Sequence, residues 1–191
     1  MQRLGLFGGS FDPVHFGHLL VAQAACEEIG LERLFFILAA QSPFKPQSVP
    51  APARERMRLL RLALVAQSNY EVDDQEIQRG GTSFTIDTLR DYASRFPGAE
   101  LFYLIGADHV LNLTKWREAE ALAGLAQFVV IPRPDSTPAP LPAPFRGRAL
   151  TGFPFGLSSS QIRGRVKDGL PIEHLVPDVV AEAIRDNRLY L

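Results

Sequence analysis

Two histidines near the start of the chain have the spacing to bind one phosphate group. They lie in the segment GGSFDPVHFGH, residues 8–18, which follows an apolar strand expected at Leu4–Phe7 and leads into a helix. A helix N-terminus offers unpaired N–H groups and the positive end of the helix dipole, so it attracts anions. His15 in the turn and His18 in the first helical turn add side-chain donors there. These residues predict a phosphate site.

The same segment has glycines where a ligand must come close. Gly8 and Gly9 follow the strand, where the backbone has to turn sharply, and a residue without Cβ leaves room for a ligand. Gly17 separates the histidines in the same way. Two alternative roles for the histidines stay open. They could be metal ligands, although Asp12 is the one acidic residue nearby, or they could be ordinary caps of the helix.

A second anion site is predicted from GLSSSQIR, residues 156–163. Serines at the start of a helix supply hydroxyl groups beside the unpaired backbone N–H groups. Arg163 follows one turn later, on the same face as Ser159 or Ser160. A planar guanidinium stays charged and can bond two phosphate oxygens at once. The alternative is an ordinary serine cap with an arginine that faces solvent.

An acidic residue follows another predicted strand. Gly106 and Asp108 belong to GADH, which comes directly after the apolar run LFYLI. Doubly wound sheets bind nucleotides at the carboxyl ends of their strands, and an aspartate there can accept hydrogen bonds from ribose hydroxyls. A simple cap of the next helix is the alternative for Asp108. No role is assigned to His109.

The elements that must position these residues are strands alternating with helices. This order predicts a Rossmann-like, doubly wound α/β fold with a mainly parallel sheet, flanking helices and a short C-terminal helical section. The expected strands are Leu4–Phe7, Leu34–Leu38, Tyr70–Val72, Leu101–Ile105 and Gln127–Ile131. The first expected helix runs from Gly17 to about Glu28, and Gly30 ends it. A second covers Arg54–Val65, and a third has Ile86, Leu89, Ala93 and Phe96 on one face. A last helical section runs from near Ser158 to near Tyr190.

Two proline-rich segments interrupt the pattern, at residues 42–52 and 132–144. Neither is compatible with regular structure. The first follows the end of a strand, where it is expected to shape or cover the site. The second is interpreted as a surface excursion without chemical importance.

Length and composition narrow the classes of protein. The 191 residues, 46% of them hydrophobic, suffice for one domain over residues 1–191. A net charge of −1 gives no electrostatic footprint for nucleic acid or a membrane, and no apolar run is long enough to span a bilayer. Cys26 has no cysteine partner and is interpreted as a core residue in a reducing compartment. A cytoplasmic protein is predicted; whether it forms a homo-oligomer is left open.

The motifs resemble those of the HxGH nucleotidyltransferase superfamily. GGSFDPVHFGH is similar to its nicotinate mononucleotide adenylyltransferase branch, GLSSSQIR resembles the ISSxxIR-type motif, and GADH resembles the GxD element. The resemblance extends from Arg3 to near Tyr190. It implies transfer of the adenylyl group of ATP to nicotinate mononucleotide, giving deamido-NAD and pyrophosphate. It also implies Mg²⁺ carried mainly by ATP, with no metal site on the protein itself.

The resemblance further implies how the site is divided. His15, His18 and Arg163 would be catalytic. ATP would be bound by Gly8, Gly9, Ser10, Phe11, His15, His18, Gly106, Asp108, Ser158, Ser159, Ser160 and Arg163. The acceptor would be bound by Lys45, Thr85, Trp116, Arg117 and Arg133, with TSFTIDTL resembling a SYTxDTL segment. Two departures occur at this end, because Phe84 replaces a common Tyr and Arg117 stands where Tyr is frequent.

The chemistry expected of such an enzyme needs no covalent intermediate. The 5′-phosphate of the acceptor is mostly dianionic at neutral pH and can attack the α-phosphate without a general base. Positioning and charge stabilisation remain for the protein to supply.

Other transferases of the superfamily are the nearest alternatives. Pantetheine-phosphate adenylyltransferases usually have Thr in place of His15, and neither they nor the cytidylyltransferases combine TSFTIDTL with Trp116. A class I tRNA synthetase would need a tRNA-binding part, which 191 residues with a net charge of −1 are not expected to supply. A nucleotide-binding regulatory protein would be expected to have lost His15, His18 or Arg163.

Overall fold

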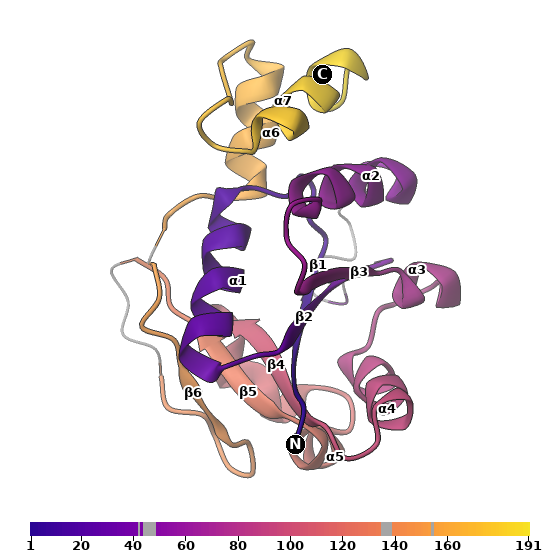
Figure 1. Ribbon diagram of the computed structural model, residues 1–191, viewed down its shortest axis with the longest axis vertical. Coiled ribbons are helices and arrows are strands. Elements are labelled where there is room, and N and C mark those ends of the chain that lie inside the picture. Colours follow the sequence, from indigo (N-terminus) through magenta and orange to yellow (C-terminus); the bar gives the residue numbers. More distant parts are fainter. Residues whose placement is uncertain (42, 44–48, 135–138, 154) are drawn as a thin grey trace.

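Six parallel strands form the centre of the protein, in the spatial order β3-β2-β1-β4-β5-β6 (Figure 1). The computed structural model describes residues 1–41, 43, 49–134, 139–153 and 155–191. The strands are β1 (Arg3–Gly9), β2 (Arg33–Leu38), β3 (Tyr70–Asp73), β4 (Glu100–Gly106), β5 (Gln127–Ile131) and β6 (Gly147–Ala149). The helices are α1 (Phe16–Ile29), α2 (Ala53–Leu64), α3 (Gln75–Arg79), α4 (Thr85–Arg95), the 3₁₀ helix η1 (Ala107–Lys115), α5 (Ala119–Leu125), α6 (Ser159–Lys167) and α7 (Asp178–Asp186).

The strand order reverses at β1, as it does in a doubly wound sheet. From β1 the chain first builds outward through β2 and β3, then returns to pair β4 with the other edge of β1. Connections therefore leave the carboxyl ends of β1 and β4 in opposite directions, which opens a crevice between them. The predicted Rossmann-like fold is confirmed, and its sheet is entirely parallel.

Alternating strand residues supply two separate cores. Along β2, Leu34 and Phe36 face one side of the sheet, whereas Phe35 and Ile37 face the other, and all four are buried. Helices α1, α2, α6 and α7 cover the first side, and α4, η1 and α5 cover the second. A strand buried on both faces reads as a continuous apolar run, as RLFFIL does.

Helix ends follow local chemistry where the sequence indicated them. Helix α1 ends at Ile29, and Gly30 follows with φ of 69°, a left-handed conformation that glycine adopts without steric cost. The predicted C-terminal helical section consists of two helices, α6 and α7. They lie beside the N-terminal end of α1 and next to α2 (Figure 1).

Short elements differ from the sequence prediction. Strand β6 was not expected, because its three residues are exposed and carry no apolar pattern; it forms by pairing with Phe128–Val130 of β5. Helices α3, η1 and α5 were also unexpected. Helices α3 and α5 span only five and seven residues, and η1 is a 3₁₀ helix, whose three residues per turn do not match α-helical spacing. Cys26 is half-buried and packs against the core on the α1 side.

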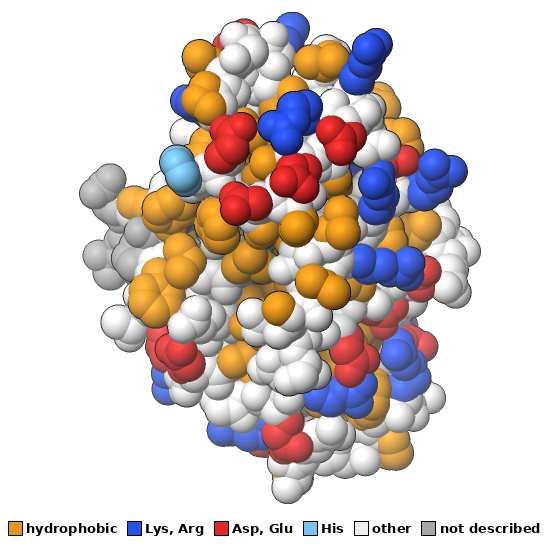
Figure 2. Space-filling view, turned by 45° about the horizontal axis from the view of Figure 1, so that its top comes forward, with side chains coloured by type: hydrophobic (Ala, Val, Ile, Leu, Met, Phe, Trp, Pro, Cys, Tyr) orange, Lys and Arg blue, Asp and Glu red, His pale blue; other side chains and the backbone are white. Residues whose placement is uncertain are grey.

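Charges are mixed on the surface around the C-terminal helices. Figure 2 turns this end of the molecule toward the viewer and shows acidic and basic side chains interspersed, with hydrophobic side chains between them. Among the described residues, no helix combines the length and apolar character that crossing a membrane requires.

Candidate active site

A cavity of about 680 Å³ lies at the carboxyl ends of β1 and β4. It is lined by every predicted site residue that the structure describes. These are Gly8, Gly9, Ser10, Phe11, His15, His18, Thr85, Gly106, Asp108, Trp116, Arg117, Arg133, Ser158, Ser159, Ser160 and Arg163. Lys45 lies outside the described residues. The fold thus brings segments from both ends of the chain to one cavity.

The two histidines stack at the start of α1. Their ring centroids are 3.7 Å apart, and the backbone N–H of His15 donates to Nδ1 of His18 over 3.2 Å. Because Nδ1 of neutral His18 is an acceptor, its proton resides on Nε2, where it is available as a donor. His18 is therefore a cap of its own helix, and one ring nitrogen remains for a ligand.

Close packing holds the histidine pair. A Cβ on Gly17 would lie 2.9 Å from the ring of His15, so a larger residue there would displace the imidazole. On the other side, Phe11 packs edge-on against His18 with centroids 5.0 Å apart. The ring of Phe11 is buried and its φ is 43°, so this residue can offer the cavity mainly its backbone.

Both imidazoles are neutral at neutral pH. Burial is the main cause that lowers the pKa of His15 to about 4, and the nearby Arg133 guanidinium acts in the same direction. Burial also holds the pKa of His18 well below its ordinary value, with smaller contributions from His15 and Arg133. The pair is thus equipped to bind a phosphate as neutral hydrogen-bond donors.

These low pKa values predict that acid destabilises the ligand-free protein. Between pH 6.5 and about 4 the unfolded chain binds a proton on His15 that the folded protein does not bind, so the free energy of unfolding falls as pH falls. At pH 5 this costs about 2 kcal/mol relative to pH 8. In urea unfolding, the free energy of unfolding should fall less between pH 8 and pH 5 in His15→Gln than in wild type, by about this 2 kcal/mol. Equal losses in both proteins would contradict the prediction.

Arg56 braces the turn that precedes the histidines, and sequence reasoning missed it. Its guanidinium is almost fully buried and donates to the carbonyl oxygens of Ser10 (2.8 Å), Ala39 (3.0 Å) and Ala51 (2.9 Å). The available signal was its place on the apolar face of α2, together with Leu59 and Leu60. A buried arginine there needs polar partners, and three loop carbonyls supply them.

Helix α6 begins beside the same turn. Ser158 is its N-cap. The Ser158 hydroxyl accepts a hydrogen bond from the backbone N–H of Gln161 and donates one to the Gln161 side-chain oxygen. The Ser159 hydroxyl donates to the carbonyl oxygen of Pro13 over 2.9 Å. Both hydroxyls thus have protein partners in this structure, and their role as phosphate donors stays a prediction. The backbone N–H groups of the first turn and Arg163 are left to meet an anion.

Arg163 reaches from α6 to the turn. Its guanidinium donates to the carbonyl oxygen of Asp12 over 2.7 Å and to Ser160 Oγ over 3.1 Å. About a third of its side chain is exposed, on the cavity side of the turn. A guanidinium has five donors, so two protein contacts leave others for a ligand.

Asp108 lies at the opposite wall, just beyond the end of β4. Its carboxylate is half-exposed and 3.4 Å from the guanidinium of Arg133. Arg133 and Pro132 follow β5 and line the cavity, so the proline-rich segment 132–144 begins at the site. The interpretation of this segment as a surface excursion was therefore wrong for its first residues. Pro43 and Pro50 of the first proline-rich segment also line the cavity, as predicted.

The far end of the cavity carries aromatic and hydroxyl groups. Thr85 Oγ1 lies 3.3 Å from the hydroxyl of buried Tyr103, and Trp116 packs edge-on against that ring. The two departures from the family pattern contact each other, because the guanidinium of Arg117 lies 4.8 Å above the ring of Phe84. Phe84 and Arg117, which stand where the family often has Tyr, therefore pack against each other at this end of the cavity.

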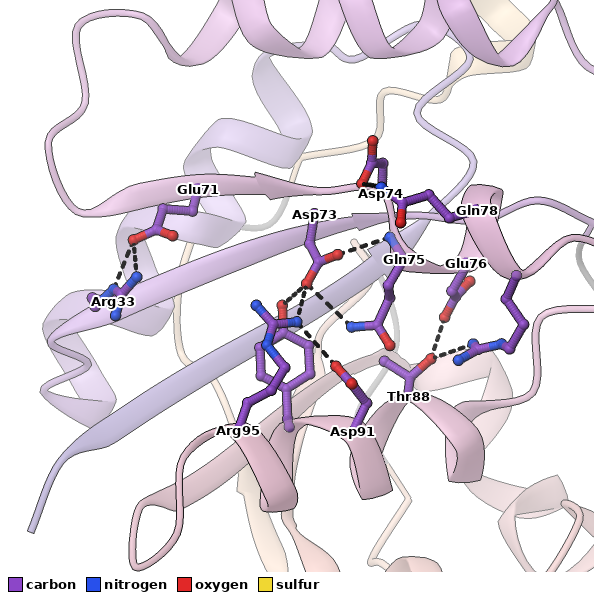
Figure 3. A network of polar contacts seen from close by, with 12 residues as sticks. Arg33, Glu71, Asp73, Asp74, Gln75, Glu76, Gln78, Thr88, Asp91 and Arg95 are labelled. Carbon is purple, nitrogen blue, oxygen red and sulfur yellow. Dashed lines mark hydrogen bonds and ion pairs between the residues drawn. The ribbon is translucent and has the colours of Figure 1, made fainter.

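A polar network fixes the helix that carries Thr85. Asp73, at the end of β3, accepts hydrogen bonds from Tyr92 (2.5 Å) and Arg95 (2.9 Å) of α4 (Figure 3). Glu76 accepts from Thr88 over 2.6 Å, is nearly fully buried and lines the cavity; burial raises the pKa of its carboxyl. Sequence reasoning did not single out this glutamate, and no motif would have indicated it.

The fold and this site together define a nucleotide-binding α/β protein of the doubly wound class. A glycine-containing turn leads from the first strand into a helix N-terminus, and the cavity lies at the point where the strand order reverses.

Comparisons with known proteins narrow this class. The family description "Cytidylyltransferase-like" matches residues 6–165. A "Probable nicotinate-nucleotide adenylyltransferase" of Opitutus terrae is 40% identical, covering 99% of this chain and 98% of the relative. A Thermus thermophilus protein of the same name is also 40% identical, with 99% and 100% covered. A Plasmodium falciparum nicotinic acid mononucleotide adenylyltransferase, solved in complex with NaAD, shares the fold with a TM-score of 0.81 at 17% identity over the whole chain and 98% of that structure.

The chain belongs to the cytidylyltransferase-like family and, within it, to the nicotinate-nucleotide adenylyltransferases, a group of nucleotidyltransferases.

Proposed function

We propose that this protein transfers the adenylyl group of ATP to nicotinate mononucleotide, forming deamido-NAD and pyrophosphate. The observation that carries the proposal is one cavity with two helix N-termini, the histidine pair and Arg163 at one end, and an aromatic end beside Thr85 and Trp116. The names of the bacterial relatives and the NaAD complex of the Plasmodium structure support this choice of acceptor.

ATP would lie along the mouth of the crevice between β1 and β4. His15 and His18 would contact the α-phosphate, because they lie at the N-terminus of α1 with donors toward the cavity. Arg163 and the first turn of α6 would contact the outer phosphates. Asp108, close to the end of β4, would accept hydrogen bonds from ribose hydroxyls. The serine hydroxyls have a smaller role in this arrangement than the backbone N–H groups beside them.

The reaction is an in-line displacement. A phosphate oxygen of the acceptor forms a bond to the α-phosphorus of ATP, and the bond from that phosphorus to the bridging oxygen breaks, releasing pyrophosphate. Charge on the α-phosphate would be stabilised by the Nε2 proton of His18, and charge on pyrophosphate by Arg163. Neither histidine needs to take a proton, which agrees with pKa values that keep both rings neutral.

Mg²⁺ would enter with ATP and neutralise charge on its phosphates. The protein groups fit this mode, because Asp12 is engaged by protein donors and Asp108 is paired with Arg133. Among the described residues, no group of three His, Cys, Asp or Glu side chains could hold a metal ion. Phosphate oxygens of ATP suit Mg²⁺, which retains several waters.

The test is product identification by mass spectrometry. The protein is incubated with ATP, Mg²⁺ and one acceptor at a time: nicotinate mononucleotide, nicotinamide mononucleotide or 4′-phosphopantetheine, and separately with CTP and phosphocholine. Deamido-NAD as the main product supports the proposal. Faster reaction with another acceptor would assign another transferase activity, and ATP binding without any product would indicate a regulatory protein.

Arg117 is predicted to contribute to acceptor choice. Its guanidinium lies over Phe84 and 3.7 Å from Asp87, at the mouth of the aromatic end of the cavity. There it can add a positive charge near the carboxylate of nicotinate mononucleotide. The neutral amide of nicotinamide mononucleotide would gain less binding energy from that charge. We expect wild type to favour nicotinate mononucleotide about ten-fold to a hundred-fold in kcat/KM. Arg117→Ala should narrow this ratio.

Arg90→Ala is the matched control for Arg117→Ala. Arg117 lies 4.0 Å from Glu118, and Arg90 pairs with the same carboxylate, but Arg90 is not among the residues that line the cavity. An unchanged kcat/KM ratio in Arg117→Ala would mean that backbone N–H groups near Thr85 read the carboxylate without Arg117. A wild-type preference for the amide would contradict the proposed substrate itself.

A further inference from the structure

We propose that Tyr190 is a positioning residue that sets the guanidinium of Arg163 by holding the carboxylate of Asp12. Tyr190 lies in the turn after α7, far from the cavity motifs in the sequence. The proposal rests on the proposed function, in which Arg163 binds the outer phosphates of ATP.

The hydroxyl of Tyr190 contacts Asp12, which lines the cavity, although Tyr190 itself does not. It donates to Oδ1 of Asp12 over 2.9 Å, and the Asp12 side chain is almost fully buried. Burial and the neighbouring Asp12 raise the pKa of Tyr190 above its ordinary range, so the hydroxyl keeps its proton. The backbone of Tyr190 has φ of 68°, a left-handed conformation that is costly for a tyrosine. The surrounding structure thus holds this side chain in one place.

Asp12 is the link between Tyr190 and Arg163. Its Oδ1 accepts from Tyr190 and from the backbone N–H of Ala51 over 3.2 Å. Its Oδ2 lies 3.7 Å from the guanidinium of Arg163, which is an ion pair without a hydrogen bond at that distance. The two donors on Oδ1 therefore keep the carboxylate from turning fully toward Arg163.

This restraint matters because a carboxylate and a phosphate compete for the same guanidinium. Arg163 is already placed by the backbone carbonyl of Asp12 and by Ser160 Oγ. Without the Tyr190 hydroxyl, the Asp12 carboxylate loses one donor and can rotate to bond Arg163 directly. Donors that would bind pyrophosphate oxygens would then be occupied within the protein, and ATP would bind less tightly.

Tyr190→Phe tests the proposal, because it removes one hydroxyl and leaves the ring. We expect the Kd of a non-hydrolysable ATP analogue with Mg²⁺ to rise about ten-fold by calorimetry, the worth of one charge-assisted hydrogen bond. The KM for ATP should rise similarly, with the KM for nicotinate mononucleotide changed much less. Tyr70→Phe is the matched control: it removes a hydroxyl that interacts with Cys26, on a residue outside the cavity lining.

A double-mutant cycle separates positioning from a general structural role. In an Arg163→Ala background, Tyr190→Phe should have no further effect on analogue binding, because it acts through Arg163. Two results would overturn the role of Tyr190. In the first, Tyr190→Phe weakens analogue binding as much in the Arg163→Ala background as it does in wild type. In the second, Tyr190→Phe alone leaves the Kd of the analogue unchanged while wild type binds it. Failure of wild type to bind the analogue or to form product would instead refute the proposed function.

Discussion

Replacing His18 with alanine is expected to lower kcat on the order of a hundred-fold or more, while the protein remains folded. His18 holds its Nε2 proton toward the cavity because Nδ1 is occupied by the backbone N–H of His15. The donor is fixed before substrate arrives, and burial keeps water from weakening it. Its loss should affect the charge that develops at the α-phosphate more than it affects substrate binding. Steady-state kinetics at saturating ATP and acceptor provide the measurement.

Two further substitutions separate the cap function of His18 from the proposed donor. His18→Asn keeps an acceptor near Nδ1, so it should preserve the bond from the His15 backbone and the thermal stability, yet lose as much kcat as the alanine variant. His18→Gln places an amide N–H near the position of Nε2 and should recover part of kcat. Near-normal kcat in either the alanine or the asparagine variant would remove His18 from the catalytic residues.

Arg163→Lys is expected to lower kcat/KM for ATP about ten-fold to a hundred-fold at saturating acceptor. Lysine keeps the charge but cannot donate to the Asp12 carbonyl, to Ser160 and to phosphate with one planar group. The apparent affinity for nicotinate mononucleotide should change much less, because the acceptor is expected at the other end of the cavity.

Arg165→Lys is the control for this charge-conserving change. Arg165 lies on the same helix but donates to the carbonyl oxygen of Pro171, and it is not among the cavity-lining residues. Its replacement should leave ATP kinetics as in wild type. Arg163→Lys could instead lower kcat/KM equally for ATP and for nicotinate mononucleotide, or lower the melting temperature together with the activity. Either result would mean that Arg163 supports the fold rather than ATP binding.

Local sequence determined the main elements of the fold. Each predicted strand was recovered to within about two residues at either end. Four of the five, β1, β2, β4 and β5, are buried and carry the apolar run that a strand covered on both faces needs, whereas β3 is only partly buried. The end of α1 at Gly30 and the cap of α6 at Ser158 were equally readable, since both depend on single residue types. Strand β6 could not be found this way. Its three exposed residues become a strand only by pairing with β5.

Most of the candidate site was likewise readable, because its motifs are local: a turn, a helix start and an acid after a strand. The motifs could not reveal the partners that reach the site from elsewhere. Arg56 contacts the turn across 46 residues of sequence, and Tyr190 contacts Asp12 across 178. Tertiary structure also decided that the Ser158 and Ser159 hydroxyls are used within the protein and that Arg117 meets Phe84.

The physical reason is the range of each interaction. Periodicity, caps and turn chemistry depend on residues within a few positions of one another. The sequence by itself therefore determined the strands, the long helices, the motifs of the candidate site and the family they resemble. Burial, pKa and hydrogen-bond partners depend on what the folded chain brings alongside. Only the tertiary structure could therefore decide that both histidines are neutral and that Asp12 joins Tyr190 to Arg163.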